Sequence, residues 1–445
     1  MCFKLLFNDK ICGIMLSMKN VIKTYPCGLR VVIRPMPNFK SVATSIFVSV
    51  GSRDELAGEN GKGGEFGLSH FVEHMLFKGT KTRSSREIAN TLSGLGVDYN
   101  AWTGTNATCY HTKGLNSNLE TCCDILSDMY FNLKFKDDDF ARECEVIVQE
   151  IAMRDDHPRM CLGELCAETF FAGTQYGHNI AGTVESVRAF KPEDIYKYMY
   201  KHYTAPKTII CFAGDITVKQ ADEMIKKYFL PNFDKKEKPV LRDLKDHILM
   251  PPQSFVTKQK DTEQQNVAVM FPVMNNNHDD KYAVTFLHEI LSGDMSSRLF
   301  ESVRDRLGLV YSIGGGMSLT HLGGYYYIYF SCTPKHTDMV LRTIASEVEH
   351  IKQDGVSEEE IQKVKNIKHA DRLFESENVE SSNQRNGSLL LEFNDIQPVE
   401  DYLENINAVN AAQVKAAAEK YLNYKNATVA IVGNKVKIKP FEILK

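Results

Sequence analysis

The sequence lacks a strong charge imbalance. Its 53 lysine and arginine residues and 57 aspartate and glutamate residues leave a net charge of −4 over 445 residues. Proteins that bind nucleic acid or an anionic membrane through electrostatics usually carry a clear basic excess. We therefore expect neither a nucleic-acid partner nor a membrane partner, and the class of partner has to be inferred from sites.

Long apolar runs are also missing. No stretch approaches the roughly 18 apolar residues that a membrane-spanning helix needs. The first residues are mildly apolar, but Asn8, Asp9 and Lys10 interrupt them and no small-residue cleavage site follows, which argues against a secretory signal. The segment is too poor in arginine for a mitochondrial transit peptide, and Met18 is an alternative start that would leave residues 1–17 outside the mature chain.

The cysteines form no recognisable pattern. There are 11, an odd number, with no C-x-x-C pair, and Cys122 and Cys123 are adjacent. Such spacing predicts neither a disulfide framework nor a thiolate zinc site. Reduced thiols fit best, so we expect a cytoplasmic location.

What the sequence does contain is an internal repeat. Residues 198–216 and 416–434 each place a helical segment before a polar turn and a strand that ends in glycine. The two glycines, Gly214 and Gly433, are 219 residues apart (433 − 214), about half the chain. We therefore expect an α+β fold of two structurally similar halves, each a mainly antiparallel sheet flanked by helices.

Composition predicts where the halves begin and end. A charged segment with several prolines separates them and is typical of a linker. We predict an N-terminal extension over 1–18, a first half over 19–230, a linker over 231–252 and a second half over 253–445. Apolar runs at 45–50 and 267–271 predict strands, and the stretches 137–154 and 357–374 predict long helices.

The stretch GLSHFVEHMLF, residues 67–77, sets two histidines and a glutamate inside an apolar run. His70 and His74 are four residues apart, so on a helix they lie one turn apart on the same face. Both imidazoles can then bind one metal ion, with the carboxylate of Glu73 beside them. The order H-x-x-E-H is the inverted-zincin signature, although an amphipathic helix whose histidines meet by chance is the alternative.

The same stretch predicts the limits of its helix. Ser69 is the expected cap and Gly79 the expected end. The expected buried stripe consists of Leu68, Phe71 and Met75.

A catalytic zinc ion needs a third protein ligand and an open coordination position. The acidic helix expected over 137–154 offers Glu143 and Glu150, which are seven residues apart and share a face. One of them can bind zinc while the other supports a histidine or the water from outside the ligand set. Beside the histidine motif, Glu150 is the favoured ligand.

Five blocks in a fixed order carry a resemblance that covers the chain from about Lys19 onward. They are GSRDE at 51–55, GLSHFVEHMLFKGT at 67–80, YNAWTGTNAT at 99–108, RECEVIVQEIAMRDDHP at 142–158 and SSRLFESVRDRLGLVYSIGGG at 296–316. With them the chain resembles the pitrilysin or insulinase-type zinc metallopeptidases. It is most similar to their bacterial and mitochondrial processing-peptidase branch.

The resemblance implies one zinc ion per chain and a role for each residue of the motif. His70, His74 and Glu150 would be the zinc ligands, Glu73 the general base and Glu143 a supporting residue. It also implies a clamshell in which the first half binds zinc and is catalytic, while a metal-free second half completes the cleft.

The second half departs from the first as the resemblance leads one to expect. Its corresponding helix has His288 and Glu289 but no second histidine. Arg304 and Tyr311 match the family's arginine and tyrosine that reach across the cleft. A guanidinium can bind a substrate carbonyl or carboxylate, and a phenol can donate to the oxyanion that forms on attack.

The segment Asn100, Ala101 and Thr103 resembles the family's edge strand, to which an extended peptide adds as a further strand. Backbone pairing of this kind binds many sequences and leaves specificity to side-chain pockets. Many relatives carry a glutamate where this chain has Asn106, so an acidic contact that could help select basic substrates is missing at this position, and we assign no preference for arginine near the cut.

These features predict a zinc-dependent metalloendopeptidase of the processing-peptidase kind, which hydrolyses peptide bonds in extended peptides or unfolded polypeptide segments. A catalytically inactive scaffold or regulatory subunit of the same fold is the main alternative, and a zinc hydrolase acting on a non-peptide amide is another. The complete set of metal-binding residues favours the enzyme. A monomer, a homodimer and a heterodimer are all compatible with the sequence.

Overall fold

The computed structural model describes residues 19–58, 64–233, 236–243, 245, 248–434 and 438–444. The extension predicted over 1–18 and part of the linker predicted over 231–252 lie outside these residues. Within them, no helix combines the length and the apolar character needed to cross a membrane. The nine cysteines of the described part are all free thiols.

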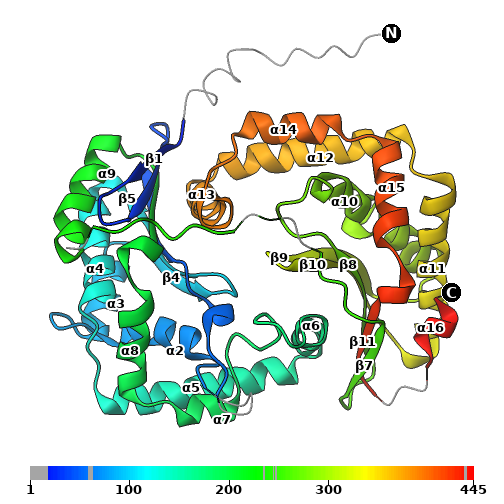
Figure 1. Ribbon diagram of the computed structural model, residues 1–445, viewed down its shortest axis with the longest axis horizontal. Coiled ribbons are helices and arrows are strands. Elements are labelled where there is room, and N and C mark those ends of the chain that lie inside the picture. Colours follow the sequence, from blue (N-terminus) through cyan, green and yellow to red (C-terminus); the bar gives the residue numbers. More distant parts are fainter. Residues whose placement is uncertain are drawn as a thin grey trace, which may run out of the picture. The chain divides into compact units, whose positions relative to one another are not determined.

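The chain forms two compact units that do not follow the two halves of the sequence completely. Of the described residues, those within 19–149, 179–242 and 373–396 form one unit, and those within 150–178, 243–372 and 397–444 form the other. Each unit contains one sheet flanked by helices (Figure 1), which confirms the predicted α+β class. Each half therefore gives one segment to the unit built by the other half.

The first unit is built on a six-stranded sheet in the order β1-β2-β6-β3-β5-β4. All neighbours are antiparallel except β2 and β6, which run parallel. Its strands are β1 (Val21–Thr24), β2 (Arg30–Pro35), β3 (Ser41–Val48), β4 (Asp98–Thr103), β5 (Thr108–Leu115) and β6 (Thr208–Gly214). Every residue of β6 is buried because both faces of the sheet are covered, so this strand reads as a continuous apolar run.

The helices of the first unit come from three stretches of the chain. They are α2 (Leu68–Met75), α3 (Ser85–Gly94), α4 (Leu119–Phe131), the first part of α5 (Asp137–Asp156), α7 (Val184–Ala189), α8 (Pro192–His202), α9 (Val218–Met224) and α13 (Val379–Phe393). The long helix predicted over 137–154 is thus confirmed as α5.

The second unit is built on a five-stranded sheet in the order β7-β11-β8-β10-β9. Its strands are β7 (Ser254–Gln259), β8 (Gln265–Val273), β9 (Ser312–Thr320), β10 (Gly323–Cys332) and β11 (Thr428–Gly433). Its helices are α6 (Pro158–Phe170), α10 (Lys281–His288), α11 (Thr337–Asp354), most of α12 (Glu358–Ser376), α14 (Val399–Ala408), α15 (Ala411–Tyr421) and α16 (Pro440–Ile443).

The two sheets repeat one topology. Without β1, the first sheet has the order β2-β6-β3-β5-β4, which corresponds strand by strand to β7-β11-β8-β10-β9. In both, the first pair is parallel and the rest are antiparallel. Gly214 and Gly433 end the corresponding strands β6 and β11 with φ angles of 121° and 150°, a backbone that favours glycine. The repeat read from the sequence is therefore a structural repeat.

The segments that the halves exchange are equivalent helices. Helix α6 belongs to the first half of the sequence but packs on the second sheet, where Phe170 joins a buried cluster with Met270. Helix α13 belongs to the second half but packs on the first sheet, where Leu390 joins a cluster with Val32 and Phe47. Each helix is the third after the two-stranded hairpin of its own half. Composition does not signal this exchange, because either sheet offers an apolar face.

Polar contacts fix α13 on the first sheet. The side-chain amide of Asn383, which is 1% exposed, donates to the carbonyl oxygens of Ala43 and Cys211 at 3.0 and 2.9 Å, and its oxygen accepts from the hydroxyl of Ser45. Buried amide groups of this kind stabilise a structure only when their hydrogen bonds are made. Asn383 thus selects one position of the helix over the sheet.

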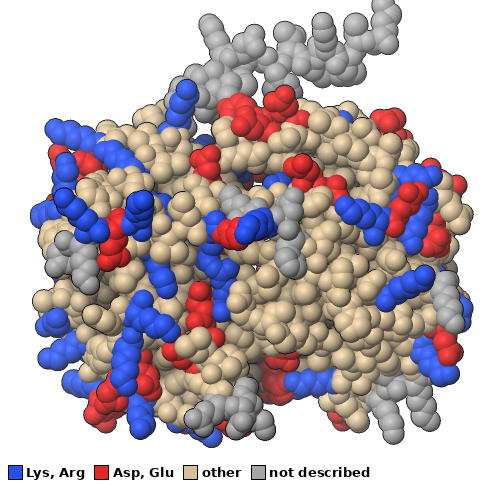
Figure 2. Space-filling view, in the orientation of Figure 1, with Lys and Arg blue, Asp and Glu red and all other residues tan. Residues whose placement is uncertain are grey.

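The surface agrees with the near-neutral composition. Figure 2 shows basic and acidic side chains interspersed on the face that it draws. Exposed basic and acidic side chains form ion pairs, such as Lys227 with Glu120 and Arg188 with Glu145.

Substitution of Gly387 tests how closely α13 packs on the first sheet. A Cβ atom at this position would lie 2.2 Å from the ring of Phe47, so we expect Gly387→Ala to lower the free energy of unfolding by about 1–3 kcal/mol. Gly163 in α6 is a matched control because its Cβ would meet nothing within 4 Å, and Gly163→Ala should stabilise by up to about 1 kcal/mol. Urea unfolding monitored by circular dichroism measures both. Equal midpoints for Gly387→Ala and the wild type would contradict this packing.

Candidate metal centre

Helix α2 is the structural basis of the site, and a carboxylate holds its first turn. The helix begins at Leu68, and the residue before it, Gly67, has a left-handed φ of 93°. Glu55, only 6% exposed, accepts the backbone N–H groups of Gly67 and Ser69, both at 2.8 Å. A negative charge at a helix N-terminus is favourable because it meets unpaired N–H groups and the positive end of the helix dipole.

The expectation that Ser69 caps this helix is wrong. Ser69 lies inside α2, and its hydroxyl pairs with that of Tyr198 at 2.7 Å. Glu55 caps the helix from twelve residues upstream of Gly67, and a capping residue so far away has no local sequence signal. In the sequence, Glu55 at the end of the block GSRDE is the feature that could have indicated this cap.

The rest of the helix follows the sequence prediction. Leu68, Phe71 and Met75 are buried. The helix continues as a short 3-10 turn, η3 (Leu76–Lys78), and ends at Gly79, whose φ is 135°. The polar residues of the motif are therefore carried on a helix that is anchored along its apolar stripe.

Three possible metal ligands converge beside this helix. One ligand atom each of His70, His74 and Glu150 lies within 4.8 Å of the other two. The division between the units falls inside α5, after Gln149, but the helix is continuous there, and Glu150 stands two turns beyond Glu143. Among the described residues this is the one group of three or more such side chains.

Glu143 holds the ring of His74. Nδ1–H of His74 donates to Oε1 of Glu143 at 2.7 Å, and the ammonium of Lys78 lies 2.5 Å from Oε2. Burial by itself would raise the pKa of Glu143, but the contacts with His74 and Lys78 outweigh it and lower the pKa. Because the proton of His74 is on Nδ1, the lone pair of Nε2 is presented to the metal position.

The geometry fits zinc. The Nε2 atoms of His70 and His74 are 3.2 Å apart. Two nitrogen ligands about 2.05 Å from a tetrahedral zinc ion lie about 3.3 Å from each other. Two imidazoles and a carboxylate are also a donor set that zinc accepts, and it is found in catalytic sites that keep a fourth position for water.

Glu73 is held by a contact that the sequence did not reveal. The hydroxyl of Thr103, the last residue of β4, donates to Oε2 of Glu73 at 2.6 Å. Thr103 was expected to contact substrate, whereas in the structure its hydroxyl contacts Glu73, the expected general base. The alternation of the strand explains this, because Tyr99, Ala101 and Thr103 share one face of β4.

β4 is an edge strand, as expected. It pairs with β5 and ends the strand order of its sheet in the described residues. Asn100 is exposed, and its side-chain oxygen accepts the N–H of Ala101 at 2.9 Å. An extended peptide could add to this edge by main-chain hydrogen bonds.

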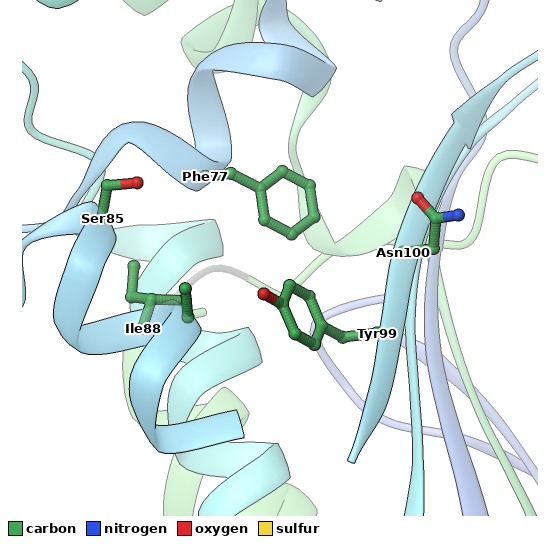
Figure 3. A pocket seen from close by; sticks show the side chains of 6 residues that line it. Phe77, Ser85, Ile88, Tyr99 and Asn100 are labelled. Carbon is green, nitrogen blue, oxygen red and sulfur yellow. The ribbon is translucent and has the colours of Figure 1, made fainter. Parts of the chain in front are cut away.

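A hollow of about 290 Å³ lies between β4 and α3. Figure 3 shows Phe77 and Tyr99 projecting into the space between the helix and the strand, with Ile88 facing them from α3. The ring centroids of Phe77 and Tyr99 are 6.3 Å apart. The lining is mostly apolar and consists of Phe77, Ser85, Ile88, Ala89, Tyr99 and Asn100. Sequence reasoning missed this hollow because α3 and β4 approach each other only in the folded chain.

The second unit carries Arg304 and Tyr311 close together. Arg304 lies in a π-helical turn, η9 (Phe300–Arg306), with its guanidinium 4.6 Å from the ring centroid of Phe300 and 5.7 Å from that of Tyr311. Tyr311, just before β9, is 80% exposed. The roles that the resemblance implies for these two side chains stay predictions.

The second unit has an ion pair in the corresponding place. Helix α10 follows β8 as α2 follows β3, and Glu289 directly after it pairs with Lys368 of α12. Both side chains are largely buried, with exposed fractions of 13% and 15%. An ammonium group thus joins the two helices that correspond to α2 and α5.

Comparison with known proteins places both halves in one family. The family model described as insulinase, peptidase family M16, matches residues 30–184, which include His70, His74 and Glu150. The model described as the peptidase M16 inactive domain matches residues 189–368. The description "inactive" therefore falls on a segment that carries none of the three possible ligands.

The chain is also similar to curated proteins named as zinc proteases and to a solved protease structure. An uncharacterized zinc protease of Bacillus subtilis, YmxG, is 30% identical over 93% of this chain and 99% of its own length. An uncharacterized zinc protease of Mycobacterium leprae is 30% identical over 92% of this chain and 91% of its own. A protease from Helicobacter pylori has the same fold, with a TM-score of 0.85 at 22% identity, over 94% of this chain and 99% of that one.

Metal analysis tests the site directly. We expect the purified chain to bind about one zinc ion and His70→Ala to lose it, because two remaining ligands are too few for a stable site. Elemental analysis after dialysis measures the zinc content. His178→Ala is a control outside the ligand group. A wild-type chain that folds and binds no zinc would contradict the assignment.

Proposed function

Because the chain belongs to the insulinase, or M16, family of peptidases, we propose that it is a zinc-dependent endopeptidase that cleaves extended peptides or unfolded polypeptide segments. The convergence of His70, His74 and Glu150 carries this proposal. A scaffold of the same fold would not need this set of ligands. The family description of an inactive domain covers residues 189–368 alone, so it does not bear on the segment that carries the three possible ligands.

The metal would be held by His70, His74 and Glu150. A zinc ion bound there lowers the pKa of water toward neutrality and polarises a carbonyl group. The chain's own part is to keep the three donors in place. Glu143 does so for His74, and Glu55 does so for the first turn of α2.

Glu73 is the proposed general base. Its carboxylate accepts a proton from the attacking water and passes it to the amine that leaves. The Thr103 hydroxyl, 2.6 Å from Oε2, holds this carboxylate in one orientation for the proton transfer. A positioned base of this kind contributes about 10²- to 10⁴-fold to a reaction rate.

The edge of β4 and the hollow beside it fit an extended substrate. A peptide that pairs with β4 is held by its main chain, so many sequences can bind. Its side chains alternate between the two faces of the sheet. Those on the face of Tyr99 approach the hollow, whose walls of Phe77, Ile88 and Tyr99 suit an apolar side chain.

Peptide cleavage tests the proposed activity. We expect the purified chain to cut internal bonds in a mixed peptide library and a zinc chelator to stop the cleavage. Glu73→Gln should keep its zinc and lose at least about 100-fold in kcat/KM, because only the base is removed. Mass spectrometry of the products and elemental analysis give both readouts.

The outcomes separate the alternatives. Cleavage that the chelator leaves intact would overturn the zinc mechanism. Full turnover by Glu73→Gln would overturn the assignment of the base. A chain that binds zinc, folds and cleaves no peptide would favour a scaffold or a hydrolase of non-peptide amides.

Thr103 gives a finer test of how the base is held. A hydrogen bond to a charged group is worth about 1.5–3 kcal/mol, so Thr103→Val should lower kcat about 10- to 100-fold with unchanged zinc content. Thr103→Ser keeps the hydroxyl and should retain most of the activity. If Thr103→Val raised KM and left kcat unchanged, Thr103 would be a substrate contact, as first expected.

A further inference from the structure

We propose that Lys78 is a positioning residue of the metal centre, acting on His74 through Glu143. This inference rests on the proposed function, since it concerns the same metal site. The three residues form one chain of contacts: Lys78 to Oε2 of Glu143 at 2.5 Å, and Oε1 of Glu143 to Nδ1–H of His74 at 2.7 Å. Lys78 lies four residues after His74, on the turn η3 that continues α2.

The contacts use both oxygens of one buried carboxylate. The Glu143 side chain is 7% exposed, whereas that of Lys78 is 29% exposed. A buried carboxylate is costly unless its oxygens are paired. With Lys78 on one oxygen, the other is held toward His74. Without it, the carboxylate loses its charged partner and can rotate away from the imidazole.

The orientation of His74 matters for the metal. An imidazole binds through one nitrogen, and the hydrogen bond of its other nitrogen fixes both tautomer and ring angle. Nδ1–H of His74 donates to Glu143, so Nε2 is the ring nitrogen that can bind the metal. Lys78 thereby acts on the ligand without touching it.

The residues that follow Lys78 are held in place by hydrogen bonds. Asp128 of α4, 6% exposed, accepts from the hydroxyls of Thr80 and Thr82 at 2.7 and 2.6 Å and from Nη1 of Arg83 at 2.7 Å. The N–H of Thr80 also donates to the carbonyl of Arg83 at 2.7 Å. The turn that follows Lys78 is thus tied to α4, and α2 precedes it. Lys78 therefore lies between helix α2 and a hydrogen-bonded turn, and its ammonium contacts Glu143 from there.

Charge explains why the position suits lysine. An isolated ammonium close to a cation site would oppose metal binding by repulsion. Here the carboxylate of Glu143 contacts both the ammonium and His74, so the positive charge is compensated locally. An ion pair that only ties α2 to α5 would stabilise the fold and leave the tautomer of His74 unaffected. The two roles therefore predict different results.

The experiment compares Lys78→Met with Lys81→Met, an exposed lysine three residues further on. We expect Lys78→Met to raise the Kd for zinc about 10- to 100-fold, the range seen when residues behind a metal ligand are replaced. Lys78→Arg keeps the charge and should recover most of the affinity. Lys81→Met should bind zinc as the wild type does. Competition with a chromogenic chelator measures all four proteins.

A second readout uses the protein without zinc. Nitrogen NMR of labelled histidine reports which ring nitrogen of His74 carries the proton. We expect a single Nδ1–H form in the wild type and in Lys81→Met, and a mixture of tautomers in Lys78→Met. Lys78→Gln, which keeps a donor without the charge, is the second variant if Lys78→Met does not fold, and it should show the same mixture.

The outcomes separate this inference from the proposed function. A wild type that binds no zinc would overturn the proposed function, while the tautomer of His74 would still decide the role of Lys78. If Lys78→Met and Lys78→Gln keep the wild-type tautomer, Lys78 does not position His74. A wild-type Kd for zinc in these variants would overturn the inference as well, even if their unfolding midpoints fall.

Discussion

The hydrogen bond between His74 and Glu143 is the contact on which the metal centre depends. It joins α2, which carries two possible ligands, to α5, which carries the third. The two helices are far apart in the sequence, so local structure cannot keep the donors together. One short bond at the buried side of the site sets the tautomer of His74 and brings Glu150, two turns further along α5, to the same position.

The surroundings of this contact explain how an apolar helix can carry the polar side chains of His74 and Glu73. His74 is bonded to Glu143, Glu73 to Thr103, and the first turn of α2 to Glu55. Each partner comes from a different element. Buried polar groups are costly when unpaired, and these pairings offset that cost while they aim each group in one direction.

The two units show what the repeat keeps and what it changes. Both keep the strand order and the exchanged helix, because these arise from the burial of a sheet face. The second unit replaces the convergent ligands with the ion pair between Glu289 and Lys368. A fixed ammonium satisfies a buried carboxylate as a metal ion would, but it has no open position for a substrate. The same architecture thus supports a candidate reactive site in one unit and a structural contact in the other.

The sequence by itself determined the features that depend on neighbours within a few residues. The four-residue spacing of His70 and His74, the seven-residue spacing of Glu143 and Glu150, and the strands ending in Gly214 and Gly433 all follow from helical or strand periodicity. The histidine motif and then the family resemblance favoured Glu150 over Glu143 as the ligand, which spacing alone could not do. Only the tertiary structure decided which distant groups meet: Glu55 rather than Ser69 at the start of α2, Thr103 at Glu73, and α6 and α13 on the sheets of the opposite halves. These contacts leave no periodic pattern in the sequence. They arise when whole helices and strands pack together, whereas a periodic pattern reflects the geometry of a single helix or strand.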